Sequence, residues 1–450
     1  MRWRELFTEG RARLTVGILL VEFLVAVQAL VVTAIMPAIR HDLGGIEYYG
    51  LVLSGFSVAA LVAAPTAGRA TDRRGPAGPF IAFSIIFVIG TLLSAAAGSM
   101  PLLAIMRVIQ GYGAGGSYTA ALTAITSALP ESGRARVLAL LSGAWIVPGL
   151  LGPSYGALMA STVGWRWAFL TMIPLSIIAT ILVLPALRGL RPAETPTSEL
   201  SLRWPLQLAL AIGMVITALS LLSWLTIPLL LAGLPLGWIA LERILPPGSL
   251  QARAGMPAAV ASIFLLIVAF IGADYFIPLL LTGVRGRSLA EAGVVVTLGT
   301  VSWSIGSWWQ ARVIMRYSRV TLARVGTAIL IVALLGIIAT LAGAPLLVCY
   351  VSWFVAGVGI GIAYPAAYLV IMQGATRTGA GAAVSSGEVA ERLGLALGGG
   401  LGGASIALAA ALHGSLTIGL AGAFALALLS ALGALALAPR LTASTTELRR

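Results

Sequence analysis

Long apolar runs separated by short polar stretches extend through the chain. About 20 apolar residues form one helix that crosses a bilayer, so the pattern predicts an all-α polytopic membrane protein with fourteen helices. We expect them at 14–36, 46–67, 78–98, 101–128, 137–160, 166–187, 205–222, 225–241, 256–282, 289–311, 322–342, 345–370, 380–411 and 415–438. The seventh and eighth are short and nearly continuous, and a single hairpin lying in the membrane interface would reduce the number to twelve.

The composition supports a membrane protein and excludes other classes. The 450 residues are 59% hydrophobic and only 10% charged, whereas soluble domains carry about 25% charged residues. The net charge of +13 comes from arginines in short loops, not from one basic, aromatic-rich face of the kind that binds nucleic acid. The single cysteine, Cys349, allows no intrachain disulfide, and the two histidines show no ligand spacing. We therefore expect no metal, no cofactor and no nucleic-acid partner.

The distribution of arginine predicts the orientation of the helices. With a cytoplasmic N-terminus, 22 of the 28 basic residues fall in cytoplasmic loops and tails and four fall in outer loops. Positive residues are retained on the cytoplasmic side, so both termini are expected to be cytoplasmic. The basic N-terminus precedes an apolar run of about 23 residues, too long for the core of a signal peptide, and predicts a first membrane helix. We expect the chain to lie in the plasma membrane as a monomer.

The two halves of the chain repeat each other weakly. A G-x-G-x-G pattern at 111–115 recurs at 357–361, and Gly68-x-x-x-Asp72 recurs as Gly306-x-x-x-Gln310. Chance repetition among 53 glycines is the alternative. A duplicated six-helix bundle around a central cavity is usual in secondary transporters. We accordingly expect bundles at 1–188 and 256–450, joined by 189–255 with two extra helices. The second copy loses charge, because Arg107 corresponds to Trp353.

A short charged segment, 68–75, separates the second and third apolar runs. Gly68 would let the two helices approach closely, Gly75 would allow a tight turn, and Asp72 would pair with a helix N-terminus or an arginine. Its pattern, G-x-x-x-D-R-x-G, resembles the signature loop between helices 2 and 3 of the major facilitator superfamily. The resemblance implies a conformational gate formed by Gly68, Asp72, Arg73 and Gly75.

Four further stretches resemble the drug:proton antiporter branches of that superfamily. They are 28–37 in helix 1, 103–113 in helix 4, 148–156 in helix 5 and 164–174 at the start of helix 6. The helix 6 pattern, G-W-R-W, is common in the fourteen-helix branch. The resemblance implies an antiporter motif that packs helices through Gly149, Gly152, Pro153 and Gly156, and it associates Arg107 with proton coupling. Gln28 occupies the place of that branch's helix 1 aspartate, and Thr171 that of its helix 6 asparagine.

Three ionisable residues inside predicted helices are candidates for proton coupling. Charge near the middle of a bilayer costs a few kcal/mol, so Glu22, Arg107 and Asp274 each need a reason to be there. Glu22 could carry the proton in place of the missing aspartate or act as a structural partner for an arginine. Arg107 could modulate a carboxyl group or serve as a strut. By the resemblance, Asp274 lies in a helix that lines the cavity, and Pro278 is expected to break that helix; simple solvation of Asp274 is the alternative.

Polar and aromatic side chains are candidates for the substrate cavity. We expect Gln28, Trp145, Tyr155, Tyr364 and Tyr368 to line it, although many tryptophans in membrane proteins are interfacial anchors. Glu388 and Arg392 are spaced i, i+4 and are expected to pair, whereas Glu391 points elsewhere and needs its own partner.

These residues and the resemblance together predict a proton-coupled secondary transporter that exports amphipathic small molecules by alternating access. Export of a lipid, a siderophore or a cell-envelope metabolite is the alternative. An enzyme is disfavoured, because no nucleophile–base–acid set, metal-ligand set or nucleotide-binding loop occurs. A channel is disfavoured because no filter repeat or ring of charges occurs. The expected partners are the substrate, protons and the lipid bilayer.

Overall fold

In the computed structural model, the described part of the chain consists of helices joined by short turns and loops. It describes residues 11–128, 144–188, 202–378 and 380–442, together with positions 8, 137, 140, 141 and 190. Twelve helical segments in these ranges are long and apolar enough to cross a membrane, and α4 (Met100–Ala128) has the length to do so as well. The all-α polytopic fold expected from the sequence is confirmed. The ends of the first and last tails, and residues 189 and 191–201 of the predicted joining segment 189–255, lie outside the described residues.

Packing divides the chain into two units. Unit 1 holds residues 1–44 and 55–209, and unit 2 holds residues 45–54 and 210–450. The helices of unit 1 are α1 (Arg11–Leu43), most of α2 (Tyr49–Arg74), α3 (Ala77–Ala95), α4, α6 (Ile146–Thr162), α7 (Trp165–Leu170), α8 (Met172–Arg188) and the start of α9 (Arg203–Leu221).

Unit 2 contains the rest of α9 and the helices that follow it. These are α10 (Thr226–Ile244), α11 (Met256–Asp274), α12 (Ile277–Leu279), the π-helical turn η3 (Leu280–Val284), α13 (Leu289–Val313), α14 (Arg319–Leu341), α15 (Leu346–Thr378), α16 (Ala380–Ala411), α17 (Leu416–Leu437) and the 3₁₀ turn η4 (Ala438–Leu441). α9 and α10 have 19 residues each, which gives each a length of about 28 Å. Each is therefore long enough for its own crossing.

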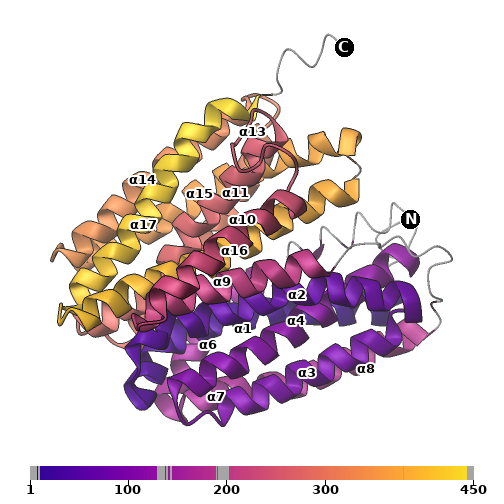
Figure 1. Cartoon of the computed structure of the whole chain (residues 1–450), viewed down its shortest axis with the longest axis horizontal. Helices are drawn as coiled ribbons and strands as arrows, with labels where there is room; N and C mark the ends of the chain where they lie inside the picture. Colours follow the sequence, from indigo (N-terminus) through magenta and orange to yellow (C-terminus); the bar gives the residue numbers. More distant parts are fainter. Residues whose placement is uncertain are drawn as a thin grey trace. The chain divides into compact units, whose positions relative to one another are not determined.

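Glycines bring the central helices of unit 1 into close contact. α3 and α4 lie side by side (Figure 1), and a Cβ on Gly113 would lie 2.2 Å from the backbone nitrogen of Phe87. A Cβ on Gly111 would lie 2.2 Å from the carbonyl oxygen of Phe56 on α2. Small residues allow membrane helices to pack backbone against backbone. The glycine pattern at 111–115 therefore has a packing role.

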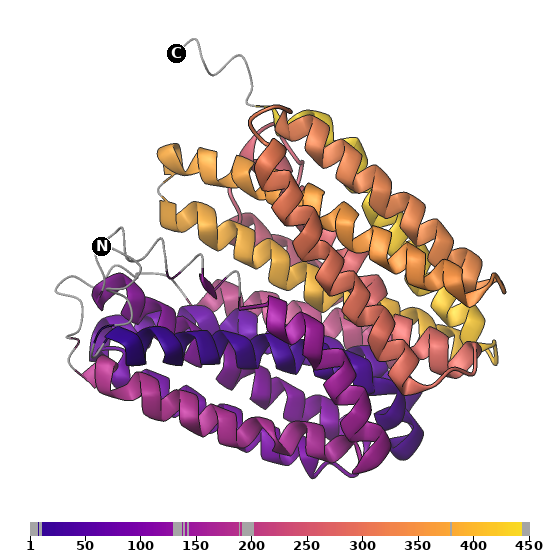
Figure 2. The ribbon, with the colours of Figure 1, turned by 180° about the vertical axis from the view of Figure 1, so that it is seen from behind.

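The repeated glycine pattern has the same role in unit 2. α15 packs against both α13 and α14, which the second view shows from behind (Figure 2). A Cβ on Gly357 would lie 2.1 Å from the carbonyl oxygen of Gly299, and one on Gly361 would lie 2.3 Å from that of Trp303. The two glycine patterns thus produce equivalent close contacts, one in each unit.

The first residues of α2 belong to unit 2, and the rest of the helix belongs to unit 1. A short 3₁₀ turn, η2 (Ile46–Tyr48), precedes them and packs on α16. A Cβ on Gly403 would lie 2.3 Å from the Cα atom of Gly50. The rings of Tyr49 and Phe276 pack with their centroids 5.8 Å apart. Unit 2 therefore holds the start of α2 through a glycine contact and an aromatic contact.

The segment 68–75 is a helix end and not the loop expected from the sequence. α2 continues to Arg74, because Ala70, Thr71 and Arg73 are compatible with a helix and Thr71 donates its hydroxyl to the carbonyl oxygen of Gly68 (2.7 Å). Gly75, with φ +76°, makes the turn as expected. The close approach expected at Gly68 is absent from the described part of the chain, since a Cβ there would meet nothing within 4 Å.

Candidate functional site

A buried carboxylate in the first helix of unit 1 accepts a hydrogen bond from a tryptophan. Glu22 lies in α1 with 7% of its surface exposed. The indole N–H of Trp145, which precedes α6, donates to Oε1 of Glu22 at 2.5 Å. Trp145 is itself 37% exposed. The structure thus joins one expected coupling residue to one expected cavity residue.

An equivalent bond occurs at the first helix of the second predicted bundle. The indole N–H of Trp353 on α15 donates to Oδ1 of Asp274 at 2.9 Å, and Asp274 is 4% exposed. α11 ends at Asp274 because the ring of Pro278 conflicts with a helical carbonyl four residues earlier. The expected helix break is confirmed. Simple solvation of Asp274, the alternative raised by the sequence, is excluded by its burial.

Arg107 belongs to a buried polar network in unit 1. Its Nη1 donates to Oε1 of Gln110 at 2.6 Å, and Nε2 of Gln110 donates to the hydroxyl of Thr91 at 2.9 Å. The guanidinium also lies over the ring of Phe56, 4.4 Å from its centroid, and the residue is 2% exposed. These contacts join α4 to α3 and α2. They fit the strut role, and the coupling role of Arg107 stays a prediction.

Tyr364 and Tyr368 on α15 lie together, as expected for neighbours at i and i+4. Their rings stack with centroids 5.9 Å apart and an interplanar angle of 25°. The hydroxyl of Tyr364 donates to Oε2 of Glu391 on α16 at 2.7 Å. Tyr364 is therefore the partner that Glu391 needed, and the sequence did not identify it because the two residues are 27 positions apart.

The other expected cavity residues have different surroundings. The hydroxyl of Tyr155 donates to the hydroxyl of Thr171 at 2.5 Å, and so joins α6 to the junction of α7 and α8. Gln28 is 1% exposed, and among the described residues neither atom of its amide has a hydrogen-bond partner. A cavity role for these two residues remains a prediction.

The proposed antiporter motif lies at the contact between α6 and α1. Gly149, Gly152 and Pro153 are buried. A Cβ on Gly156 would lie 3.1 Å from side-chain carbons of Val31 and Ile35, tighter than an ordinary contact. A Cβ on Gly152 would be in ordinary contact with Leu30. Of Gly152 and Gly156, Gly156 therefore makes the closer contact with α1.

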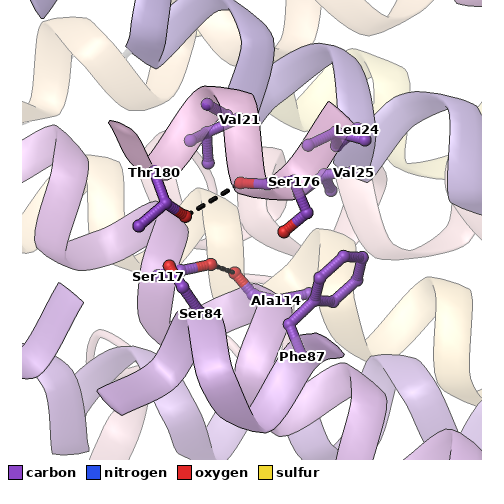
Figure 3. Close-up of a pocket in the computed structure, with 10 residues that line it drawn as sticks. Val21, Leu24, Val25, Ser84, Phe87, Ala114, Ser117, Ser176 and Thr180 are labelled. Atoms are coloured by element: carbon purple, nitrogen blue, oxygen red, sulfur yellow. Dashed lines mark hydrogen bonds between the residues drawn. The ribbon is translucent and has the colours of Figure 1, made fainter. Parts of the chain in front are cut away.

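A small cavity of about 20 Å³ lies inside unit 1 (Figure 3). Valine, leucine and phenylalanine side chains form much of its wall, with hydroxyls from α3, α4 and α8. The lining residues are Val21, Leu24, Val25, Ser84, Phe87, Ala114, Ser117, Ser176, Ala179 and Thr180. The volume holds about one water molecule. It is too small for a drug-sized substrate, which needs about 300 Å³ or more.

A charged cluster missed by the sequence analysis ties the start of α7 to α1. Asp42 accepts from Nη1 of Arg166 at 2.7 Å and from the indole N–H of Trp165 at 3.0 Å. Nη2 of Arg166 also donates to the carbonyl oxygen of Ala97 at 3.4 Å. The G-W-R-W pattern thus supplies both donors to one carboxylate. The sequence analysis missed this pairing because Asp42 and Arg166 lie 124 positions apart.

The comparison with known families identifies the chain. The family model described as Major Facilitator Superfamily matches residues 18–399. The chain belongs to the major facilitator superfamily.

Relatives and solved structures agree with this membership. A probable multidrug-efflux transporter of Mycobacterium tuberculosis (strain H37Rv) is 30% identical over 353 residues, which cover 74% of each chain. The multidrug efflux pump SdrM of Staphylococcus aureus (strain N315) is 22% identical over 80% of this chain and 81% of its own length. The multidrug transporter MdtP of Bacillus subtilis is 25% identical over 66% of this chain, and the match covers 57% of MdtP.

Two solved structures show the same fold. The crystal structure of a D-xylose–proton symporter matches with a TM-score of 0.65 and 15% identity over 94% of this chain and 96% of its own. A bacterial homologue of the human lysosomal transporter Spinster matches with a TM-score of 0.62 and 18% identity over 96% of each chain. As a member of this superfamily, the chain is a multi-pass membrane transporter and not an enzyme.

Proposed function

We propose that this transporter exports amphipathic small molecules in exchange for protons, by alternating access. It would lie in the plasma membrane with both termini in the cytoplasm and would act as a monomer. The multidrug-efflux relatives support the substrate class and the direction of transport. The hydrogen bond between Trp353 and Asp274 supports proton exchange and is the observation on which that part of the proposal depends.

An indole is a suitable partner for a carboxyl group that gains and loses a proton. A carboxylate accepts from the indole N–H, and a protonated acid still accepts at its carbonyl oxygen. An arginine partner would be left as a buried, uncompensated cation each time the carboxyl became neutral. The indole carries no charge, so the pair has no such cost. Asp274 can therefore exchange a proton without losing its hydrogen bond.

Glu22 offers the same chemistry in unit 1 through Trp145. The tryptophan partners of the two buried carboxylates differ in exposure to solvent, because Trp353 is completely buried whereas Trp145 is partly exposed. We assign Asp274 as the main proton carrier and Glu22 as the secondary one. Arg107 would hold the helices of unit 1 in register through Gln110 and Thr91.

The segment 68–75 would still contribute the conformational gate. Asp72 is half-buried and Arg73 is exposed near the end of α2, where Gly75 turns the chain. Asp72 would favour one conformation through a charge-assisted hydrogen bond.

Export of a lipid, a siderophore or a cell-envelope metabolite is the second candidate. The uncharged amide of Gln28, at the position of the related transporters' aspartate, favours a cargo that needs no countercharge at helix 1. A transport screen that includes both cationic dyes and lipids separates the two candidates.

We expect inverted vesicles that contain the wild-type protein to accumulate amphipathic dyes when a proton gradient is imposed, acid inside. Accumulation should stop when a protonophore collapses the gradient. Vesicles without the protein provide the control. Dye accumulation that persists after the gradient is collapsed would contradict proton coupling, and accumulation of lipids alone would favour the second candidate.

The orientation can be tested at the turn between α9 and α10. Two crossings would place Ser223 on the outer side, because both helices have the length of a span. In a background that carries Cys349→Ala, the Ser223→Cys variant should react with an impermeant thiol reagent in intact cells. Reaction only after permeabilisation would contradict the two crossings and the proposed orientation.

A further inference from the structure

Five aromatic side chains in unit 2 form a continuous series of ring contacts, here named the aromatic ladder. In order of contact they are Trp353, Phe270, Trp303, Tyr364 and Tyr368. Trp353 stacks on Phe270 with centroids 5.0 Å apart and an angle of 10°. Phe270 meets Trp303 edge to face at 5.2 Å, and Trp303 meets Tyr364 at 5.7 Å. The ladder draws its rings from α11, α13 and α15.

The two ends of the ladder differ in exposure and in the carboxylates they contact. Trp353 and Phe270 are buried, and Trp353 binds Asp274. Trp303, Tyr364 and Tyr368 are half-buried, and Tyr364 binds Glu391, which is half-buried as well. Glu391 lies inside the candidate span Ser385–Ala411. Ionisable side chains in a span face a protein interior or a water-filled space and not lipid. Because its residues are also partly exposed, the Tyr364 end of the ladder is the end open to a solute.

The charge at this open end is suited to a cation. Glu388 and Glu391 are both close enough to Tyr364 and Tyr368 for their negative charges to influence the two tyrosines. Among the described charged groups near these tyrosines and glutamates, Arg392 is the basic one, and its positive charge is attracted to the negative charge of Glu388. The faces of aromatic rings are negative and attract cations, with tryptophan and tyrosine among the strongest. The aromatic rings and the carboxylates thus both give this end of the ladder a negative potential.

We propose that the open end of the aromatic ladder binds an aromatic organic cation. The rings of Trp303, Tyr364 and Tyr368 contact the flat apolar part of the solute, and Glu391 supplies the countercharge. Tyr364 is a positioning residue, because its hydroxyl holds Glu391 in place. This inference rests on the proposed export function and names one substrate class and its site.

A matched pair of probes tests the charge preference of this site. We would measure equilibrium binding of 10-methylacridinium, a permanent planar cation, and of acridine, kept neutral by an alkaline buffer, to the full-length protein in lipid nanodiscs. A cation–π contact and a partly desolvated countercharge together should favour the cation by about tenfold. The fluorescence of each probe reports its own binding.

Three variants separate the roles. Glu391→Gln should remove the roughly tenfold preference for the cation and leave the affinity for neutral acridine unchanged. Tyr364→Phe, which keeps the ring and loses the hydroxyl, should reduce the preference by less. Glu242→Gln is the control, because Glu242 is also bonded to an aromatic side chain, Trp238, but on the exposed face of α10. It should bind both probes as the wild type does.

Two results would overturn the site. One is an unchanged cation preference in both Glu391→Gln and Tyr364→Phe, and the other is an equal loss of both probes in Glu391→Gln without a change in thermal stability. Binding and transport fail separately. Cation binding that depends on Glu391, without dye accumulation in vesicles, would refute the export function and retain the site. Dye export that is insensitive to Glu391→Gln would refute the site and retain the function.

Discussion

Asp274→Asn is expected to abolish proton-gradient-driven export while leaving substrate exchange in the absence of a gradient intact. The amide is isosteric with the acid and still accepts the N–H of Trp353 through its oxygen. It cannot take up or release a proton, so the transport cycle loses its driving reaction and keeps its binding steps. Both activities can be measured in proteoliposomes, with and without an imposed pH gradient.

Asp42→Asn is the matched control for this change. Asp42 is half-exposed and pairs with Arg166 at the end of α1, and exposed pairs contribute at most about 1 kcal/mol to stability. The control variant should transport normally. Trp353→Phe tests positioning, since it keeps an aromatic ring on Phe270 and removes the N–H. It should shift the pH profile of transport, whereas a purely structural defect would lower the rate equally at every pH.

Full gradient-driven export by Asp274→Asn would contradict the assignment of Asp274 and would leave Glu22 as the candidate proton carrier. Glu22→Gln would then be the variant that abolishes coupling. Loss of exchange as well as of driven export would indicate a substrate-binding role for Asp274 in place of proton transfer.

Gly113→Ala is expected to cause a large loss of stability, because the added methyl group would overlap backbone atoms of the neighbouring helix. The added Cβ would lie 2.2 Å from the backbone nitrogen and 2.6 Å from the Cα atom of Phe87. Because both are backbone atoms, no side-chain rotation can relieve the overlap, and α3 and α4 must separate. Overpacking of this kind costs about 1–3 kcal/mol and occasionally more.

Thermal unfolding of the purified protein, followed by tryptophan fluorescence, measures this effect. Gly78→Ala is the matched control, because a Cβ at Gly78 in α3 would meet nothing within 4 Å. We expect a lower melting temperature than that of the wild type for Gly113→Ala, and an unchanged melting temperature for Gly78→Ala. Equal melting temperatures for the two variants would refute the backbone contact between α3 and α4.

The fold was predictable from the sequence, because a bilayer imposes a length on every apolar helix. The repeated glycine patterns at 111–115 and 357–361 were visible in the sequence as a sign of duplication, but the backbone contacts that Gly113 and Gly357 make became visible only in the structure. The helix end at Arg74 was not predictable from apolar patterning. Charged residues end an apolar run at the membrane surface, but they continue the helix beyond it.

The sequence identified individual ionisable residues that the structure buries, but it did not identify their partners. The cost of burying charge identified Glu22, Arg107 and Asp274 before the structure was known. Their partners lie 123, 3 and 79 positions away, at Trp145, Gln110 and Trp353. Only the i, i+3 partner follows from helix geometry. The two tryptophan partners require the tertiary arrangement of helices, and the aromatic ladder requires three helices at once.

The most direct test of proton exchange is to drive protons with the substrate alone. Proteoliposomes would be loaded with a transported dye, with equal pH on both sides and a pH-sensitive fluorophore trapped inside. Dye efflux through the wild-type protein should acidify the lumen, and efflux through the Asp274→Asn variant should leave the luminal pH unchanged. Dye efflux through the wild-type protein without any change in luminal pH would contradict proton coupling.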